Sequence, residues 1–282
     1  MTNVSAGIVL YNPDISRLRE NINAILPQVD FIVLVDNASQ NIKKVESMYC
    51  NFDNIFFIKN KKNLGVATAL NQIVKFCETK NVKWVLTLDQ DSVVSHNLIE
   101  NYVKYISYDR VAIITPKIMY RNDSQNQSIL VKKSEPQYEY VEKCITSGSF
   151  INIPICKEIG YFDDKMFIDL VDFEYCIRIQ KANYKILRLN NVALNHQLGD
   201  LKIYNFFGKK IFVTNHSELR YYYYARNSLY YLKKHKNYLS KKNVYLKLMI
   251  KSLKIILFES EKFLKLKAIC LGIKDGYRMK RS

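Results

Sequence analysis

The chain has 282 residues, of which 48% are hydrophobic, and a formal net charge of +17. This composition is ample for a packed core and excludes a disordered chain. The six cysteines are scattered and form no CxxC pair, which argues against a zinc site and a disulfide framework and favours a reducing compartment. The short apolar stretch at residues 6–10 has no basic region before it, so we expect no signal peptide, no spanning helix there and a cytoplasmic location.

The positive charge is concentrated in the last quarter of the chain. Residues 211–282 hold 17 Lys and Arg side chains against 4 Asp and Glu side chains. Such a local excess of basic side chains has three possible explanations: binding to anionic lipid headgroups, binding to nucleic acid, or a helix that is simply solvated. Composition alone does not choose among them.

The first 120 residues alternate between short apolar runs and stretches with helical spacing. The runs predicted as buried strands are Val4–Tyr11, Phe31–Asp36, Ile55–Lys59, Trp84–Leu88 and Val111–Thr115. The predicted helices are Ile15–Leu26, Val66–Cys77 and Leu98–Ile106. This alternation predicts an α/β fold, in which helices flank a mostly parallel sheet.

The pattern changes further along the chain. Arg121–Tyr140 is polar and weakly patterned, which predicts a long loop or a lid. From Tyr221 to about Leu271 the alternation stops, and Tyr, Leu, Ile and Lys recur at helical spacing. We therefore expect a helical, basic C-terminal region.

Ligands of open α/β sheets bind beyond the carboxyl ends of the strands, so the polar residues that follow each strand are candidates. Four segments qualify: Tyr11-Asn12, Asp36 to Ser39, Asn60 to Gly65 and Asp89 to Ser92. Asp89 and Asp91 follow a very apolar strand, and two such carboxylates can hold Mg²⁺ or Mn²⁺ against a diphosphate. The alternative for this pair is a solvated acidic turn.

Two further segments suit a nucleotide. The Asp36 carboxylate can accept the imino proton of a pyrimidine base, although the same residue is also a good helix N-cap. Asn63 and Gly65 open the predicted helix Val66–Cys77, where a glycine permits close backbone approach and the helix N-terminus favours phosphate or ribose oxygens. A plain turn is the alternative there.

The order of these segments resembles the inverting glycosyltransferases with the GT-A fold, whose pattern is strand–Asp–Asn–Ser, then Asn-x-Gly, then a DxD strand. The resemblance covers residues 3–235. Five later segments resemble the bacterial rhamnosyltransferase branch: Thr146–Phe150, Gly160–Asp163, Phe167–Arg178, Asn195–Asp200 and Tyr224–Asn227. The resemblance implies a Rossmann-like catalytic domain at 1–215, with a nucleotide-sugar half (1–120) and an acceptor half (121–215), followed by the helical region 216–282. It implies dTDP-β-L-rhamnose as the donor.

The resemblance also implies a catalytic base. Inversion needs a carboxylate that takes the acceptor proton, and Asp172 occupies the place of the aspartate in the family's Glu-Asp pair. Val171 stands where the glutamate is usual, so the base has no acidic neighbour in the pair. Asp169 is the second candidate, on the same helical face if the helix begins that early. We expect Glu174 and Arg178 to form an ordinary surface pair four residues apart.

Further roles follow from the same resemblance. Tyr11, Asn12 and Arg226 are implied in nucleotide binding, although Arg226 has the alternative of packing among tyrosines. His196 is implied as a third metal ligand or as a hydrogen-bond donor to the diphosphate. The residues implied in the acceptor wall, with a simple strand turn as the alternative, are Ser147, Gly148 and Phe150.

Between Lys241 and Lys267, apolar side chains form a stripe and lysines recur at intervals of three, four or eight residues. The stretch lacks the ~20 uncharged residues that span a bilayer, so it suits a membrane surface, or else packing on the catalytic domain or on a second subunit in a homodimer. Tyr221–Tyr224 beside Arg226 invites a nucleic-acid interpretation, but no nucleic-acid-binding motif accompanies it, and we expect no nucleic-acid partner.

Three hypotheses result. The first is a rhamnosyltransferase that acts on a lipid-linked saccharide at the inner face of the plasma membrane. The second is a transferase of the same fold that uses another nucleotide sugar, such as a UDP-hexose. The third is a non-catalytic module that binds membrane or nucleic acid.

Overall fold

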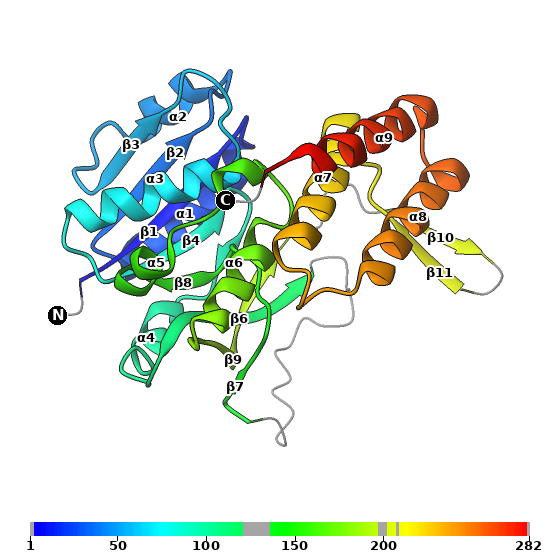
Figure 1. Cartoon of the computed structure of the whole chain (residues 1–282). Coiled ribbons are helices and arrows are strands. Elements are labelled where there is room, and N and C mark those ends of the chain that lie inside the picture. The colour runs from blue at the N-terminus through cyan, green and yellow to red at the C-terminus, as the bar shows by residue number, and fades with distance from the viewer. Residues whose placement is uncertain (1–2, 121–135, 197–201, 207–208, 281–282) are drawn as a thin grey trace. The chain divides into compact units, whose positions relative to one another are not determined.

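The computed structural model describes residues 3–120, 136–196, 202–206 and 209–280 (Figure 1). The chain divides into two compact units. The first unit comprises Met1–Lys165 and Tyr175–Gln197, and the second comprises Met166–Glu174 and Leu198–Ser282. The short segment Met166–Glu174 therefore belongs with the C-terminal helices, although it lies far from them in sequence.

The first unit is built on a sheet with the strand order β3-β2-β1-β4-β8-β6-β9-β5, with β7 paired to β9. Strands β1 to β4 run parallel, as predicted, while β8 is antiparallel to both β4 and β6. The α/β prediction is confirmed, and the sheet is mixed beyond β4. The strands are β1 (Val4–Leu10), β2 (Phe31–Asp36), β3 (Ile55–Lys59), β4 (Trp84–Asp89), β5 (Val93–Val94), β6 (Val111–Tyr120), β7 (Tyr138–Tyr140), β8 (Ser149–Asn152) and β9 (Lys185–His196).

Helices connect these strands. They are α1 (Ile15–Ile25), α2 (Ile42–Tyr49), α3 (Val66–Thr79), α4 (Leu98–Val103), α5 (Ile153–Ile159) and α6 (Val171–Lys181), with 3-10 turns at Leu26–Gln28 and Asp164–Met166. Helix α1 begins where the sequence predicts, because Asp14 caps it by accepting from the backbone N of Arg17 at 2.9 Å. Helix α3 packs directly on β1, since a Cβ at Gly7 would lie 2.2 Å from Ile73. The glycine of β1 is thus required by this close approach.

Two predicted segments end differently from expectation. Strand β6 continues to Tyr120, five residues beyond the predicted end, because it pairs in parallel with β9 across a register shift between Pro116 and Lys117. Most of the predicted loop Arg121–Tyr140 lies outside the described residues. Its last three residues form β7, antiparallel to β9, so the prediction of a long loop or a lid is wrong for Tyr138–Tyr140.

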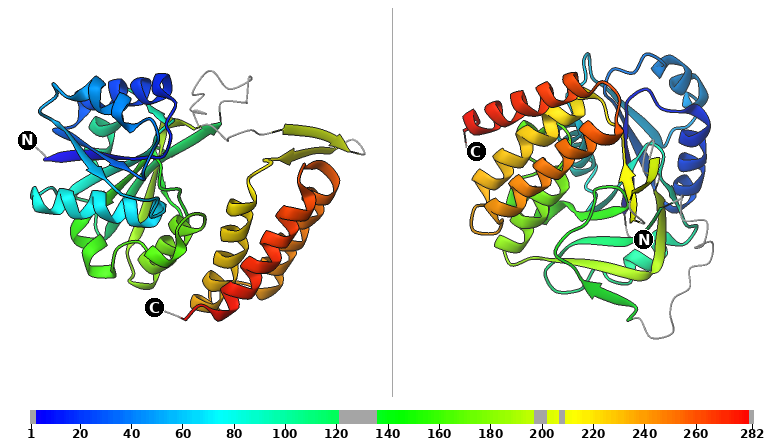
Figure 2. Two further views of the ribbon diagram at one scale, coloured as in Figure 1. Left: turned by 90° about the horizontal axis from the view of Figure 1, so that it is seen from above. Right: turned by 90° about the vertical axis from the view of Figure 1, so that its right-hand side faces the viewer.

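The second unit contains a hairpin and three helices that lie side by side (Figure 2). Its elements are β10 (Lys202–Phe206), β11 (Lys209–Val213), α7 (Glu218–Lys234), α8 (Lys241–Phe258) and α9 (Lys262–Arg278). Helices α7 and α9 approach closely at two glycines, because a Cβ at Gly272 would lie 2.3 Å from the Tyr222 carbonyl oxygen and one at Gly276 would lie 2.5 Å from that of Arg226. The predicted helical region is confirmed.

The apolar stripe predicted between Lys241 and Lys267 is divided between two helices at a buried polar cluster. Lys265 is 1% exposed, and its Nζ lies 3.0 Å from Glu259 Oε2 and 2.7 Å from Asn215 Oδ1. The Tyr221 hydroxyl donates to the other Glu259 oxygen at 2.5 Å. Lys265 is one of the lysines that recur between Lys241 and Lys267, and the sequence predicts it on a cationic helix face. That prediction is wrong for Lys265, because its ammonium group is an internal partner of Glu259.

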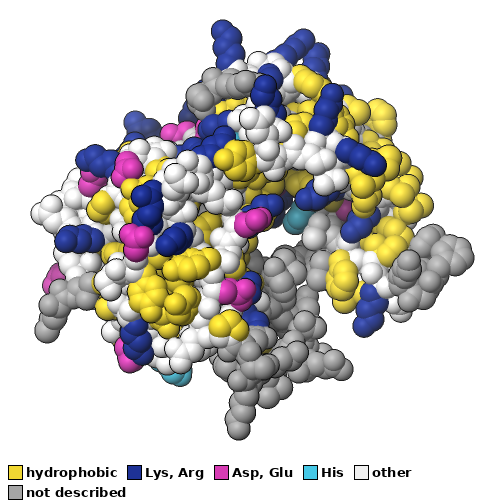
Figure 3. Space-filling model, turned by 60° about the horizontal axis from the view of Figure 1, so that its bottom comes forward, with side chains coloured by type: hydrophobic (Ala, Val, Ile, Leu, Met, Phe, Trp, Pro, Cys, Tyr) yellow, Lys and Arg dark blue, Asp and Glu magenta, His cyan; other side chains and the backbone are white. Residues whose placement is uncertain are grey.

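Charge on the surface is predominantly positive. On the face drawn in Figure 3, dark blue Lys and Arg side chains outnumber magenta Asp and Glu side chains. Within the described part of the chain, no helix is long and apolar enough to cross a bilayer.

Candidate functional site

The parallel register brings three loops to one edge of the first unit's sheet. Strand β1 lies between β2 and β4, with Leu10 opposite Asp36 and Val9 opposite Asp89. Neighbouring strands are about 4.8 Å apart, so the two aspartates flank the end of β1 at about twice that spacing. The segments that follow β1, β2 and β4 therefore meet at the edge where α/β sheets bind ligands.

The loop after β2 is joined to the loop after β1. Asp36 is 1% exposed, and its carboxylate oxygens accept from the backbone N of Ser39 at 3.2 and 3.1 Å. Ser39 Oγ in turn accepts from the backbone N of Asn12 at 2.8 Å. Helix α2 begins only at Ile42, so the alternative that Asp36 is a helix N-cap is wrong. The carboxylate instead shapes the loop.

Backbone strain marks the same loops. Asn12 and Ala38 have positive φ angles of 48° and 64°. Such conformations are unfavourable for residues other than glycine and persist where surrounding structure holds them, often at functional sites. Here the holding contacts include Gln40, whose backbone N donates to Asn12 Oδ1 at 2.8 Å.

Asn37 connects the β2 loop to the segment before α3, and sequence reasoning assigned it no role. It is 2% exposed, and its Oδ1 accepts from Asn60 Nδ2 at 3.0 Å and from the backbone N of Leu64 at 3.4 Å. Its Nδ2 donates to the Gly65 carbonyl at 3.3 Å. Gly65 has φ 86° and immediately precedes α3, while Asn63 Oδ1 accepts from the Gly65 N at 2.9 Å. The signal in the sequence was the place of Asn37 directly after Asp36, in the strand–Asp–Asn–Ser pattern.

Side chains of helix α1 hold the Asp89–Asp91 segment by hydrogen bonds to its backbone carbonyls. Asn21 Nδ2 of α1 donates to the Asp89 carbonyl at 2.8 Å, and Arg17 Nη2 donates to the Asp91 carbonyl at 3.1 Å. Between them, the Gln90 side chain accepts from the Tyr11 N at 2.8 Å and donates to the Tyr11 carbonyl at 3.3 Å. These contacts fix the backbone of the segment, and both aspartates are half-buried.

Ser147 belongs to this segment and not to an acceptor surface. It is 1% exposed, its Oγ accepts from the Asp89 N at 3.0 Å, and it donates to Ser92 Oγ at 2.8 Å. The Gly148 N donates to the Thr87 carbonyl at 2.8 Å. Phe150 is fully buried and stacks on Trp84 with ring centroids 5.1 Å apart. The acceptor-wall expectation is therefore wrong for Ser147, Gly148 and Phe150, because all three are enclosed.

His196 is brought near the same segment by strand pairing. Strand β5 begins two residues after Asp91, and its Val93 lies opposite Asn195 of β9. His196 is the next residue of β9, where its backbone pairs with Tyr120 of β6. The His196 side chain lies outside the described residues.

These residues fit a divalent cation that is shared with a substrate. Among the described side chains, no group of three or more His, Cys, Asp and Glu residues is arranged to hold a metal. Mg²⁺, however, is commonly bound by one or two carboxylates together with substrate phosphates, and it keeps several waters. Asp89 and Asp91, on a segment with a fixed backbone, supply two such carboxylates.

In the second unit, Asp169 precedes a helix and does not belong to it. Helix α6 begins at Val171, and Phe167, Asp169 and Leu170 all have positive φ angles, of 54°, 64° and 64°. The helix does not begin early enough for Asp169 and Asp172 to share a helical face, which is the condition for that expectation. Asp169 forms an ion pair with Arg220 at 3.2 Å, while Asp172 is half-buried in the first turn of α6.

Asn227 of α7 holds this strained segment, 167–170. Fully buried, it donates through Nδ2 to the carbonyls of Met166, Ile168 at 2.6 Å and Asp169 at 3.1 Å. Its Oδ1 accepts from Arg226 Nε at 3.1 Å and Nη2 at 2.9 Å. The sequence named Asn227 only as part of a motif, and the motif does not reveal its partners.

Arg226 packs against aromatic rings, which orient its guanidinium. Its guanidinium carbon lies 4.6 Å from the Tyr223 ring centroid, and Phe167 stacks on that ring at 4.4 Å. Nearby, Glu174 is fully buried, with Oε1 3.0 Å from Lys234 Nζ and 3.1 Å from His235 Nε2. The expected surface pair of Glu174 and Arg178 is wrong in that respect, because Glu174 is not at the surface.

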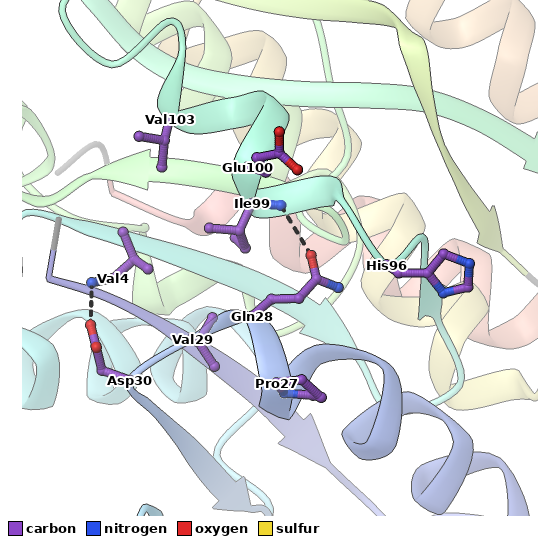
Figure 4. A pocket seen from close by; sticks show the side chains of 9 residues that line it. All are labelled: Val4, Pro27, Gln28, Val29, Asp30, His96, Ile99, Glu100 and Val103. Atoms are coloured by element: carbon purple, nitrogen blue, oxygen red, sulfur yellow. Dashed lines mark hydrogen bonds between the residues drawn. The ribbon is translucent and has the colours of Figure 1, made fainter. Parts of the chain in front are cut away.

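A cavity of about 450 Å³ lies at a different edge of the first unit (Figure 4). Val4, Gln28 and Ile99 line it, and Gln28 Oε1 accepts from the Ile99 N at 3.2 Å. Val4 is the first residue of β1, at the opposite end of that strand from Tyr11. No residue predicted for the site lines this cavity.

Comparison with known proteins gives consistent results. The family model described as Glycosyl transferase family 2 matches residues 5–162. The dTDP-rhamnosyl transferase RfbF of Shigella flexneri is 27% identical over 247 residues, which are 83% of this chain and 81% of that protein.

Solved structures agree in fold. The crystal structure of GalNAc-T7 with UDP, GalNAc and Mn²⁺ aligns with a TM-score of 0.65 at 16% identity, covering 99% of this chain and 56% of that one, so this chain spans little more than half its length. The structure of S. aureus TarS 1-349 with UDP-GlcNAc aligns with a TM-score of 0.57 at 15% identity, covering 97% of this chain and 81% of that one.

Proposed function

Because the chain belongs to glycosyl transferase family 2, we propose that it transfers L-rhamnose from dTDP-β-L-rhamnose to a hydroxyl of a saccharide acceptor with inversion. Nucleotide-sugar transfer is the activity that the family supports. The rhamnose donor is supported by the similarity to RfbF over most of both chains. The geometric observation that carries the proposal is the register that sets the Asp36 loop and the Asp89–Asp91 segment on either side of β1.

Donor recognition is assigned to the loops of the first unit. Each Asp36 oxygen accepts one hydrogen bond from Ser39 and retains a lone pair for the imino proton of a pyrimidine. Tyr11, Asn12, Asn63 and Gly65 are assigned to the nucleotide because their backbone is linked to the same loops. Arg226 is assigned to the diphosphate, with its guanidinium already oriented by Tyr223.

Asp89 and Asp91 would hold Mn²⁺ or Mg²⁺, with His196 as a further ligand. When bound, the ion supplies positive charge against the departing diphosphate. A divalent metal is supported by the GalNAc-T7 structure, which contains Mn²⁺. The residues of this chain contribute the fixed backbone, because Asn21, Arg17 and Ser147 hold the segment in place before any ligand arrives.

The acceptor proton is assigned to Asp172. Inversion requires one carboxylate that accepts the proton of the attacking hydroxyl. Asp169 is less suited to this role, because Arg220 already neutralises its charge at 3.2 Å.

We further propose that the acceptor is lipid-linked, that the reaction belongs to the synthesis of a bacterial cell-surface polysaccharide, and that the protein is peripheral on the inner face of the plasma membrane. The support is the excess of 17 basic over 4 acidic side chains in residues 211–282. The alternative is that residues 211–282 pack on a second subunit in a homodimer.

A UDP-hexose is the second candidate donor, because the TarS and GalNAc-T7 structures contain UDP or a UDP-sugar. Slow hydrolysis of dTDP-rhamnose in the presence of Mn²⁺ tests the first candidate without knowledge of the acceptor. We expect release of rhamnose by the wild type and none by Asp91→Ala. Calorimetric titration with dTDP and with UDP compares the bases, and tighter binding of UDP with hydrolysis of a UDP-hexose would replace rhamnose as the donor. If Asp91→Ala keeps full biological activity, the chain is a binding module.

A further inference from the structure

Helix α8 exposes a row of large apolar side chains. They are Leu246 (42% exposed), Met249 (62%), Ile250 (44%), Leu253 (52%), Ile256 (47%) and Leu257 (48%). The successive intervals of three, one, three, three and one residues keep these side chains on one face of the helix. The opposite side carries Leu248 and Ile255, which are buried in the core of the second unit. We call these six exposed residues the α8 face. They are not part of the apolar surface that the second unit buries in its own core.

Two further large apolar side chains are exposed at the start of α9. Phe263 and Leu264 are 78% and 50% exposed. The hairpin contacts α8 through Tyr204, whose ring centroid lies 5.1 Å from that of Phe258, so Ile203 and its cross-strand partner Phe212 lie on the other face of the hairpin. Exposed apolar side chains gathered on one helix face are uncommon on a monomer and mark an interaction surface.

The charges around this surface indicate its partner. Residues 241–280 contain 11 Lys and Arg side chains and 3 Asp and Glu side chains. Two of the three acidic groups are engaged within the unit, Glu259 with Lys265 and Asp275 with the Tyr222 hydroxyl at 2.9 Å. Lys241, Lys242 and Lys247 are exposed on α8. A second copy would present the same positive charge to this surface, whereas an anionic bilayer would complement it.

We propose that the α8 face, with Phe263 and Leu264, inserts into the headgroup region of an anionic lipid bilayer while α8 lies in the membrane plane. Apolar side chains that enter the boundary between headgroups and acyl chains are removed from water, which stabilises the membrane-bound state. Flanking lysines contact lipid phosphates. This inference specifies which residues bind the membrane that the proposed function names as a partner. It rests on the proposed function only for the biological purpose of membrane binding, because insertion needs neither donor nor acceptor. It restricts binding to defined residues of α8 and α9.

Sedimentation with vesicles tests the proposal on the full chain. We expect binding to phosphatidylcholine vesicles that contain phosphatidylglycerol and weaker binding to phosphatidylcholine alone. The triple variant Met249→Ser, Leu253→Ser, Ile256→Ser should lower the partition coefficient at least about tenfold, which corresponds to about 1.4 kcal/mol. A matched control, Phe52→Ser with Leu219→Ser, removes exposed apolar side chains (43% and 57%) outside the surface and should leave partition unchanged.

A second measurement reports how deeply α8 inserts into the bilayer. The single tryptophan of the chain, Trp84, is 4% exposed in β4, so a tryptophan added at the surface gives a separable signal. Brominated lipids should quench the added fluorescence of Leu253→Trp and leave that of Phe52→Trp unchanged. Lys241→Gln with Lys242→Gln and Lys247→Gln should weaken binding and reduce its dependence on salt.

The proposal is overturned if the triple variant binds vesicles as well as the wild type does. It is also overturned if the wild type ignores vesicles and the triple variant instead converts a dimer into a monomer in sedimentation equilibrium. Donor hydrolysis in solution separates the two proposals, because the triple variant should hydrolyse the donor at the wild-type rate. Vesicle binding without any donor hydrolysis would remove the proposed function and leave the membrane surface intact.

Discussion

The side-chain amide of Asn227 in α7 donates to the Ile168 carbonyl at 2.6 Å, fixing a segment in which three non-glycine residues have positive φ. The same amide contacts the carbonyls of Met166 and Asp169. The segment leads directly into the first turn of α6, where Asp172 lies. The backbone conformation before the proposed base therefore depends on one side chain that is distant in sequence.

Replacement of Asn227 by Asp should lower kcat at least about tenfold, because a carboxylate cannot donate to these carbonyls and the segment would relax from its strained conformation. Nucleotide affinity should change little, since the loops assigned to the nucleotide are held by other contacts. Steady-state kinetics and calorimetry measure the two effects. Ser228→Ala is the matched control, because Ser228 is buried in the same helix and bonds only within it, to the Tyr224 carbonyl at 2.7 Å. An equal loss of kcat in both variants would reduce Asn227 to a stabilising residue.

Ser147→Ala should weaken the binding of the divalent metal and so raise the metal concentration that activity requires. The variant removes the hydrogen bonds that Ser147 makes with the Asp89 N and the Ser92 hydroxyl, at a cost of about 1–3 kcal/mol, and it loosens the segment that carries both proposed metal ligands. We expect the Mn²⁺ concentration for half-maximal donor hydrolysis to rise. Ser149→Ala removes a hydroxyl of equal burial that donates to the Ile145 carbonyl at 2.6 Å, and its metal requirement should stay at the wild-type level. Identical metal titrations for the two variants would contradict the role of Ser147.

Asp172→Asn should abolish transfer and retain nucleotide binding. The amide keeps the size of the side chain but cannot take the acceptor proton. Transfer assays and calorimetry with the same preparation provide the measurement. Turnover that survives in Asp172→Asn and disappears in Asp169→Asn would assign the base to Asp169, with Arg220 as its partner.

Burial, with added repulsion from Arg220 and Lys251, lowers the pKa of His216 to about 4. The unfolded chain has the ordinary imidazole pKa of about 6.5, so between those two values the unfolded state binds more protons than the folded state. Stability should therefore fall as the pH decreases from about 6.5 to about 4. His216→Gln should flatten this part of the profile in denaturant unfolding at several pH values. A wild-type profile that is flat over the same interval would show that His216 is protonated without cost in the folded protein.

The α/β class and the order of the first elements could be predicted because they depend on local patterns. Apolar runs bounded by polar residues located β1 to β4, and Asp14 located the start of α1. The candidate edge of the sheet followed from the same patterns, since parallel strands place the residues after them together. These features require only the periodicity of burial and the chemistry of turns.

The partners of individual side chains depend on packing between distant parts of the chain. Ser147 contacts Asp89 and not an acceptor, Asn227 holds the segment before α6, and Lys265 is enclosed by Glu259 and Asn215. The strand position of Phe150 is compatible with a place in the acceptor wall or in the hydrophobic core. Its stacking on Trp84 shows that it belongs to the core. A sequence reports which residues are apolar or polar at each step, whereas the hydrogen-bond partner of a buried polar group is selected only when the elements are brought together.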